Sequence, residues 1–449
     1  MEGKDIAVIG GGISGLGSAW LLQRRHGVTL YERNAVAGGH THTVDAPSAS
    51  GPVPVDTGFI VYNERNYPHL TGLFATLGIE TRPSDMSFSA SVDGGRLEYA
   101  GSGLATLFAQ RRNLLRPRFW GMLRDILRFN RQGRAILAIA DGRGRSLGEF
   151  LAENGYGSAF RDYYLLPMAA AIWSCPVRTM LDFPLVSFLS FFNNHGLLQL
   201  DDRPQWRTVV GGGRTYVERI LSDLRERQGD AAVQTGDPVV RVERDAEGVT
   251  VVTANGYHRR HDEVVLAGHA DEMLHLLADP SASESALLGS FHYQPNHAVL
   301  HSDPALMPRR RAVWSAWNYL ADGSSAGTER VSVTYWMNCL QGLESADRDL
   351  FVSLNPLQEP DPEQVIARRD WDHPVFDQPA MEAQGGIAGL QGIHRTWYAG
   401  AWLGYGFHED GLRSAVEVAR GLGVEPPWTP SHAESPVEEP LPMGQPEVT

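Results

Sequence analysis

A glycine-rich turn between two short apolar segments, close to the N-terminus, constrains the fold of this chain more than any other feature. Residues 5–9 and 28–31 are apolar runs of strand length, and residues 13–25 between them have helical spacing. Strand, helix and strand in this order predict the start of a parallel, doubly wound sheet. We therefore expect an α/β protein whose first domain begins at the N-terminus.

The turn spans residues 10–15 (GGGISG) and contains the pattern G-x-G-x-x-G. In such a turn the glycines let the backbone approach a pyrophosphate, and the start of the helix supplies free N–H groups. Glu32 closes the second apolar run, where a carboxylate can accept hydrogen bonds from ribose hydroxyls. The order of strand, helix, strand and acid favours a dinucleotide site over a glycine-rich turn without a ligand.

The size and charge of the chain limit its number of domains and the kinds of partner that it can bind. It has 449 residues, more than the ~250–300 that a single hydrophobic core usually serves, so we expect two domains. The formal net charge of −14 argues against nucleic acid as a partner. The two cysteines, Cys175 and Cys339, give no metal-site spacing and suit a reducing compartment. The first strand has no signal-peptide pattern before it, and we expect a cytoplasmic protein.

Lysine is almost absent from the chain. Lys4, just before the first apolar run, is the only lysine, and all other basic side chains except histidine are arginine. Mechanisms that need an active-site lysine, such as Schiff-base formation or a lysine that holds water against a flavin, therefore have no suitable candidate.

Residues 101–140 are helical in pattern and rich in arginine, with Asp125 as the only acid among the arginines at 111–134. Large apolar side chains are interleaved with the arginines. Such a segment can bind the inner face of an anionic membrane peripherally, where each basic side chain contributes ~1 kcal/mol. The alternative is an ordinary solvated helix pair whose arginines meet acids elsewhere on the protein, and the pattern leaves both open.

The most apolar part of the chain runs from Tyr163 to Leu200 and carries only two charges, Arg178 and Asp182. A transmembrane helix needs ~20 apolar residues without interruption. Three prolines and an Asn-Asn-His-Gly turn interrupt this stretch. We expect it to form the core of the second domain, or a wall around an apolar ligand.

Residues 32–39 (ERNAVAGG) extend the nucleotide motif as E-x5-G-G, and the last predicted strand leads through glycines into a helix. In these features the chain resembles the superfamily of flavin-containing amine oxidases and phytoene desaturases. A closer resemblance is to bacterial FAD-dependent oxidoreductases related to the flavin domain of plant cyclopropane fatty acid synthases. That group is similar to enzymes that desaturate methyl-branched fatty acyl chains on the route to furan fatty acids. This closer resemblance is carried by residues 38–45, 55–70, 171–176, 191–198 and 206–217.

The resemblance implies a two-domain FAD fold of the glutathione-reductase type, with a Rossmann-like FAD domain and an α+β substrate domain. FAD would be noncovalent, because neither cysteine lies in an attachment motif. Residues 1–80, 201–275 and 385–423 would form the FAD domain. Residues 81–200 and 276–384 would form the substrate domain, and the Pro- and Glu-rich residues 424–449 a disordered tail.

The family pattern also implies cofactor contacts along the length of FAD. Residues expected at the pyrophosphate are Gly10, Gly12, Ser14 and Gly15. Those expected at the ribose and the second phosphate are Glu32, Arg33, Gly38, Gly39 and His40. Val240 is expected to touch the adenine through its backbone, and Ala401 stands at the position that contacts the ribityl chain. Gly58 and Phe59 are expected at the isoalloxazine, with Gly411 and Leu412 at the start of the helix beneath it. His40 departs from a common arginine and Ala401 from a common acid, for which Glu409 and Asp410 are candidate replacements.

For oxidation of an acyl chain, flavin N5 accepts hydride while the protein orients the substrate and excludes water. A base must then take a neighbouring proton. His195 is the candidate base, because histidine can titrate near neutrality, although a hydrogen-bonded structural histidine is the alternative. Tyr62 and Asn63, shortly after Phe59, are candidates to orient the substrate.

The predicted function is FAD-dependent desaturation of a methyl-branched, unsaturated fatty acyl chain, carried on phospholipid. The main alternative is a polyunsaturated fatty acid isomerase or a carotenoid-type desaturase. An amine oxidase is disfavoured by the lysine count. The remaining alternative is a non-catalytic flavin-binding partner of a lipid methyltransferase. The expected partners are a lipid substrate, an anionic membrane surface and a lipid methyltransferase.

Overall fold

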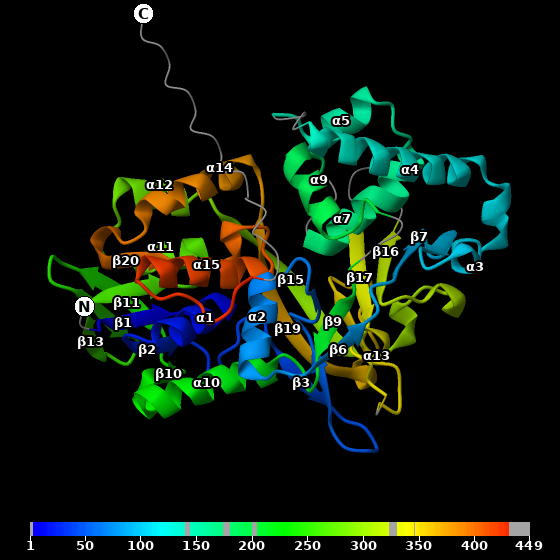
Figure 1. Ribbon diagram of the computed structural model, residues 1–449. Coiled ribbons are helices and arrows are strands. Elements are labelled where there is room, and N and C mark those ends of the chain that lie inside the picture. The colour runs from blue at the N-terminus through cyan, green and yellow to red at the C-terminus, as the bar shows by residue number, and fades with distance from the viewer. Residues whose placement is uncertain are drawn as a thin grey trace, which may run out of the picture.

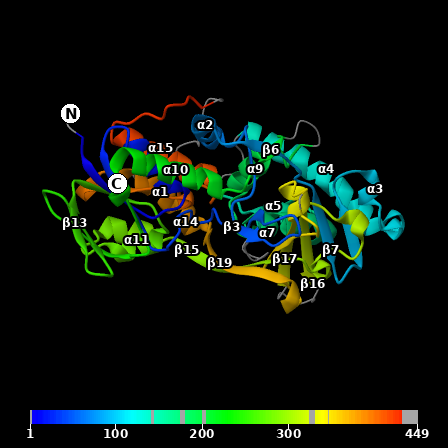
Figure 2. The same cartoon turned by 90° about the horizontal axis from the view of Figure 1, so that it is seen from below.

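The computed structural model describes residues 3–139, 144–173, 180–199, 204–322, 330–344 and 346–430. These residues form two halves that lie side by side (Figures 1 and 2). One half is built on a parallel sheet and the other on a larger mixed sheet. Cys175 and most of the expected tail, residues 431–449, lie outside the described residues.

A five-stranded sheet organises the first half. Its order is β10-β2-β1-β14-β20, and every neighbouring pair is parallel. The strands are β1 (Asp5–Ile9), β2 (Gly27–Glu32), β10 (Val233–Thr235), β14 (Glu263–Leu266) and β20 (Thr396–Tyr398). The strand, helix and strand predicted at the N-terminus are therefore confirmed, as is the α/β class with a Rossmann-like sheet.

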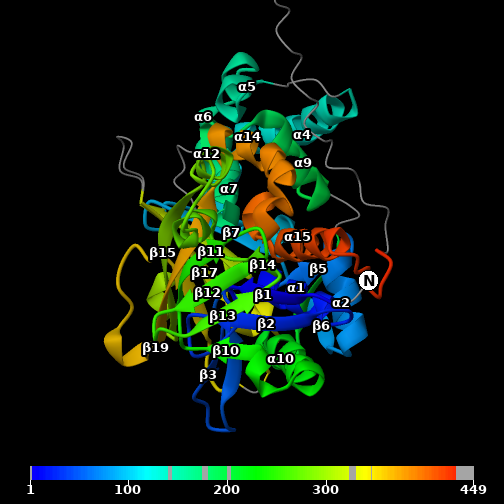
Figure 3. The ribbon, with the colours of Figure 1, turned by 90° about the vertical axis from the view of Figure 1, so that its left-hand side faces the viewer.

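The side chains of β1 alternate between the two faces of this sheet. Ile6 and Val8 face a core shared with the helices α1 (Ile13–Leu22), α10 (Arg214–Gln228) and α15 (His408–Gly421). Ala7 and Ile9 face a core shared with a three-stranded antiparallel sheet. That sheet consists of β11 (Val239–Arg244), β12 (Val249–Thr253) and β13 (His258–His261). It lies on the opposite side of β1 and β2 from α15 (Figure 3).

A seven-stranded mixed sheet organises the second half. Its order is β19-β15-β18-β17-β16-β7-β8, and only β16 and β7 pair in parallel. Its strands are β7 (Phe88–Val92), β8 (Leu97–Ala100), β15 (His292–His301), β16 (Trp317–Asp322), β17 (Arg330–Trp336), β18 (Phe351–Leu354) and β19 (Val365–Val375). The long strands β15 and β19 run from this sheet towards the first half (Figure 1).

Helices cover the outer end of the seven-stranded sheet (Figure 1). They include α3 (Leu104–Leu107), α4 (Pro117–Ala138), α5 (Leu147–Glu153), α7 (Leu166–Trp173) and α9 (Leu185–Asn194). The apolar stretch predicted to be core supplies α7 and α9, whose described apolar side chains pack into the main core of this half. None of the helices in the described ranges is both long and apolar enough to cross a membrane.

The packing divides the chain differently from the ranges expected of the two domains. Helices α12 (Ala282–Leu288) and α14 (Gln378–Ile387) share the core of the parallel sheet. Val53 and Val55 share the core of the second half. Trp428 stacks on Trp20 at 6.0 Å, so the start of the expected tail packs against the first half.

Candidate active site

A cavity of about 750 Å³ lies between the two halves and is lined by residues from both. One end is formed by the loop between β1 and α1 and by the end of β2. The opposite end is formed by α7, α9 and four strands of the seven-stranded sheet. The volume falls within the range of cavities that bind cofactors and drug-sized ligands.

At the first end, Gly10, Gly12 and Ser14 line the cavity, as predicted for a pyrophosphate site. Gly12 is the N-cap of α1 and makes no side-chain cap, so the first N–H groups of the helix have no acceptor within it. A Cβ atom added at Gly12 would meet only the Cα of Gly39, at 4.0 Å. The space in front of the helix is therefore open, and it fits the phosphates of a dinucleotide.

Gly15 does not line this end of the cavity, in contrast to the expectation. A Cβ atom added there would lie 1.8 Å from the carbonyl oxygen of Gly10. Gly15 instead lets α1 pack closely against the loop that follows β1. Gly38 also lies behind the wall, where its N–H donates to the carbonyl oxygen of Gly11 at 2.7 Å.

Glu32 and Arg33 line the same end of the cavity. Oε2 of Glu32 accepts from the N–H of Gly11 at 2.7 Å, and Oε1 accepts from the side-chain amide of Asn34 at 2.7 Å. Arg33 is paired with Glu272 at 2.7 Å. Glu32 thus holds the glycine-rich loop and presents a carboxylate where a ribose would bind.

The adenine contact expected from the backbone of Val240 stays a prediction. Val240 is 50% exposed and does not line the cavity, whereas Val239 and Pro238 do. The pairing of β11 with β12 shifts register between Val239 and Arg241, which turns the side chain of Val240 outwards.

A Glu32→Ala variant should lose flavin more readily than the wild type. The substitution removes the ribose acceptor and frees the N–H of Gly11, so we expect flavin to bind about 10- to 100-fold more weakly. Flavin release measured by fluorescence during dialysis tests this result. Glu32→Gln, which keeps one acceptor oxygen, is the matched control and should fall between the two. A Glu32→Ala protein that retains its full yellow colour would contradict the assignment.

The middle of the cavity is formed where residues 39–40 and residues 58–59 approach each other closely. Gly39, His40, Gly58 and Phe59 all line it, as the family pattern implied. A Cβ atom added at Gly58 would lie 2.1 Å from the carbonyl oxygen of His40, so only glycine permits this approach. The N–H of Phe59 donates to the same carbonyl at 2.8 Å.

Asp56, two residues before Gly58, holds residues 58–59 in place. Its carboxylate accepts from the hydroxyl of Thr43 at 2.6 Å, the N–H of Gly213 at 2.9 Å and the side-chain amide of Gln341 at 2.9 Å. Burial raises the pKa of Asp56 to about 7. The aspartate therefore joins three distant segments around the cavity, those that contain Thr43, Gly213 and Gln341.

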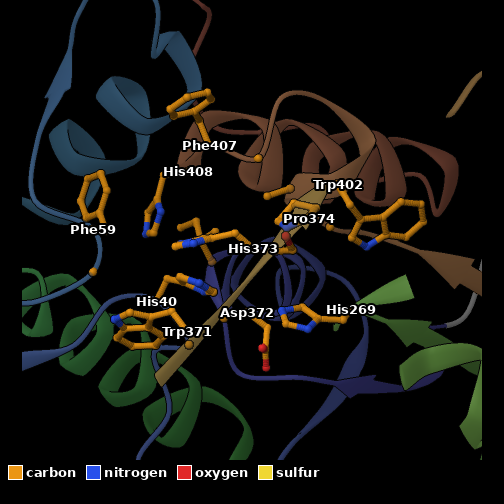
Figure 4. A pocket seen from close by; sticks show the side chains of 18 of the residues that line it. His40, Phe59, His269, Trp371, Asp372, His373, Pro374, Trp402, Phe407 and His408 are labelled. Carbon is orange, nitrogen blue, oxygen red and sulfur yellow. The ribbon is translucent and has the colours of Figure 1, made fainter. Parts of the chain in front are cut away.

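Two histidines that sequence analysis did not place together face this middle part (Figure 4). His40 stacks on Trp371 with ring centroids 4.7 Å apart, and its buried Nε2 has no hydrogen-bond partner among the residues that the structure describes. Burial, followed by the charge of His373, holds the pKa of His40 well below its usual value. His40 is thus a neutral imidazole with an unsatisfied nitrogen, which a bound ligand would satisfy.

His408, at the start of α15, stacks on Phe59 with centroids 3.8 Å apart. Its Nε2 lies 2.8 Å from the hydroxyl oxygen of Thr41 and 3.1 Å from that of Tyr216. Burial lowers the pKa of His408 to about 3, so the ring is neutral. Phe407 and His408 therefore provide the cavity wall that was expected from Gly411 and Leu412.

Gly411 and Leu412 lie behind this wall, on the side of α15 that packs against α1. Ala401 does line the cavity, together with Trp402. The two acids proposed as ribityl contacts do not. Glu409 accepts from the N–H groups of His69 and Leu70 at the start of α2 (Pro68–Leu77), and Asp410 accepts from that of Phe407. Both carboxylates are engaged by backbone amides, which turns them away from the cavity.

The far end of the cavity is apolar and aromatic. The charged residues that line the cavity, Glu32, Arg33, Glu272 and Asp372, gather at its nucleotide end; Asp372 lies beside His269 in Figure 4. Within the described ranges, no charged side chain lines the far end. Its walls include Phe88, Met168, Ile172, Phe191, Trp317, Tyr335 and Leu354.

His195 is the polar group that the sequence predicted for this end, and it lines the cavity. Its Nδ1–H donates to the carbonyl oxygen of Phe191 at 3.0 Å, and its ring stacks on that of Phe191 at 3.8 Å. Burial lowers the pKa of His195 to about 4. Because Nδ1 carries the proton, Nε2 holds the free lone pair of a neutral imidazole.

Tyr62 and Asn63 were expected to orient the substrate, and this expectation is wrong. Both side chains are buried outside the cavity. The hydroxyl of Tyr62 donates to that of Thr81 at 3.3 Å, and Oδ1 of Asn63 accepts from the N–H of Asn66 at 2.9 Å. They form the two-residue strand β5 (Tyr62–Asn63), which pairs with β9 (Trp206–Val209), and the side chain of Tyr62 packs into the core of the first half.

Comparison with known proteins agrees with this architecture. The family model of flavin-containing amine oxidoreductases matches residues 13–421. A putrescine oxidase bound to putrescine superposes with a TM-score of 0.66 at 15% identity, over 93% of this chain and 98% of that one. A fatty acid isomerase from P. acnes that produces CLA superposes with a TM-score of 0.65 at 17% identity, again over 93% and 98%.

A cyclohexylamine oxidase from Brevibacterium oxydans IH-35A superposes with a TM-score of 0.64 at 17% identity, over 94% of this chain and 100% of that one. No curated protein matches the chain by sequence. At these identities the solved structures establish the fold and leave the substrate open.

Proposed function

The chain belongs to the family of flavin-containing amine oxidoreductases and is therefore an FAD-dependent oxidoreductase, and we propose that its substrate is an unsaturated fatty acyl chain. Following the resemblance described above, a methyl-branched chain carried on phospholipid is the specific form of this proposal. The open phosphate site at Gly12, the carboxylate of Glu32 and the unsatisfied nitrogen of His40 all fit bound FAD.

The observation that carries the proposal is the apolar end of the cavity. An ammonium ion moved into such an environment loses its hydration, and no carboxylate among the described residues there replaces it. A hydrocarbon chain, in contrast, gains ~0.8 kcal/mol for each methylene group buried. The far end therefore favours an acyl chain over an amine.

The position of lysine supports the same choice. Lys4 is the only lysine, and its Nζ is paired with Glu263 at 2.5 Å, at the start of the parallel sheet. A lysine that holds water at the flavin is therefore absent from this chain.

When bound, FAD supplies the hydride acceptor at N5. The chain's own residues hold the acyl group between aromatic walls and exclude water from it. Loss of hydride from an allylic or methine carbon makes the neighbouring C–H strongly acidic. Nε2 of His195 has the free lone pair to take that proton, and a pKa of about 4 suffices for so acidic a donor. The acyl chain loses a hydride and a proton and gains one double bond.

An isomerase is the second candidate, because a fatty acid isomerase shares the fold. Isomerisation would use the same hydride removal but return the hydride at another carbon. Mass spectrometry of the acyl chain after turnover distinguishes the two: a product lighter by two hydrogens supports the desaturase, and an unchanged mass with a moved double bond supports the isomerase. Turnover of amines without turnover of lipids would overturn both.

A further inference from the structure

The outward face of α4 carries large apolar side chains and arginines in alternation. Trp120, Arg124, Leu127, Arg131 and Arg134 follow one another at spacings of three or four residues, which places them on one stripe of the helix. Trp120 is 49% exposed and Leu127 is 56% exposed. The opposite stripe, which includes Phe119, Met122 and Phe129, is buried in the core of the second half.

Exposed apolar side chains gather on this part of the chain and are sparse elsewhere. Leu104, Leu114, Leu115, Trp120, Leu127 and Ile139 are six of the ten large apolar residues exposed in the structure. Leu115, in the short helix before α4, is 86% exposed. Trp120 is held next to this short helix, because its Nε1–H donates to the carbonyl oxygen of Leu114 at 2.9 Å. Single exposed apolar residues are ordinary, but a cluster marks an interaction surface.

The same surface is positively charged although the whole chain has a formal charge of −14. Arg111, Arg131 and Arg134 are exposed and form no ion pair with another described residue. The one acid of α4, Asp125, is buried; it accepts from the N–H of Gly157 at 3.0 Å and is paired with Arg124 and Arg128, each at 3.5 Å. On the adjacent α5, Glu149 caps its own helix and Glu153 is paired with Arg145. Nearby acids therefore leave Arg111, Arg131 and Arg134 without an ion-pair partner among the described residues.

We propose that this surface, formed by residues 104–139, docks on the surface of an anionic lipid bilayer. The apolar side chains would enter the boundary between headgroups and acyl chains, while the long arginine stems reach headgroup phosphates. The charge pattern fits an anionic bilayer, because the arginines are interleaved with exposed Leu and Trp side chains.

The position of this surface relative to the cavity connects it with the substrate. Helix α9 packs against α4 on one side, and its Phe191 lines the apolar end of the cavity on the other. The helix that carries the docking surface thus packs directly against a helix that lines the cavity, and α4 and α9 lie next to each other in Figure 1. The proposed docking rests on the proposed function in one respect: an acyl substrate would give the protein a reason to dock on a bilayer.

Sedimentation with vesicles tests docking apart from catalysis. The full-length holoenzyme is mixed with vesicles of saturated phosphatidylglycerol and phosphatidylcholine, which contain no unsaturated substrate, or with saturated phosphatidylcholine alone. We expect binding only to the anionic vesicles, weakened by added salt. Arg131→Gln/Arg134→Gln should lower the binding constant about 25-fold, a factor of about five for each charge. Trp120→Ser/Leu127→Ser should lower it at least about tenfold.

The matched control is Arg225→Gln/Arg227→Gln, which makes the same change in net charge on α10, far from α4 (Figure 1). This variant should bind like the wild type, and all variants should keep their flavin absorbance and melting temperature. Equal binding by wild type and the α4 variants would overturn the proposal. So would a dimer that forms without lipid and dissociates on Trp120→Ser/Leu127→Ser substitution. Docking on saturated vesicles without turnover of any lipid would refute the proposed function and leave the docking surface intact.

Discussion

A Gly12→Val variant should fold normally and purify without yellow colour. Gly12 has φ −78° and ψ −177°, an extended conformation that valine adopts readily, and an added Cβ would meet only the Cα of Gly39, at 4.0 Å. The space in front of the helix is where the backbone must approach the pyrophosphate of FAD. The valine side chain would keep the backbone N–H groups from donating to the pyrophosphate. Loss of these charge-assisted hydrogen bonds should weaken flavin binding by at least about 100-fold, or ~2.8 kcal/mol.

The measurement is the absorbance of flavin per protein after gel filtration, with circular dichroism as the test of folding. Gly389→Val is the matched control, since a Cβ at Gly389 meets nothing within 4 Å and Gly389 does not line the cavity. The control should remain yellow. A Gly12→Val protein that is folded and fully yellow would show that the phosphates bind elsewhere.

A His195→Ala variant should bind flavin normally but turn over its lipid substrate about 10²- to 10⁴-fold more slowly, the range for loss of a general base. His195 lines the apolar end of the cavity, away from the glycine-rich loop, so its loss should leave the colour unchanged. Tyr62→Phe is the control, because the Tyr62 hydroxyl donates to Thr81 and does not reach the cavity. Near wild-type turnover by His195→Ala would exclude it as the base.

The pH dependence of turnover is a second test of His195 as the base. With its pKa lowered to about 4, His195 is neutral above that pH, so kcat/KM should be flat near neutrality and fall as the pH drops through about 4. The lowered pKa also means that the unfolded chain binds the proton more tightly. Stability contributed by this neutral histidine is lost as the pH falls from 6.5 towards 4, so rate and melting temperature must be measured separately.

The nucleotide end of the site could be predicted because it is local in sequence. The strand, glycine turn, helix and Glu32 lie within one short segment, and their spacing fixes where they meet. The outward direction of the Val240 side chain could not be predicted, because it follows from a register shift in β11 that no sequence pattern indicates. Gly411 and Leu412 were expected to line the cavity beside the flavin ring. They do not, because α15 buries them against α1, while His408 before them faces the cavity.

The middle of the cavity could not be predicted, because its parts come from distant segments. Trp371 and His373 reach His40 only because the long strand β19 extends from the second half towards the first. Tyr62 was misplaced for a different reason. It follows the cavity-lining Val61 directly, and strand alternation turns the next side chain into the core.

The most direct test of the acyl substrate is the flavin absorbance of the purified protein under anaerobic conditions. The protein is titrated with a methyl-branched, unsaturated phospholipid and, separately, with putrescine and cyclohexylamine. The apolar end of the cavity and the lack of an active-site lysine predict that the lipid alone bleaches the flavin. Bleaching by an amine, with no response to the lipid, would contradict the account.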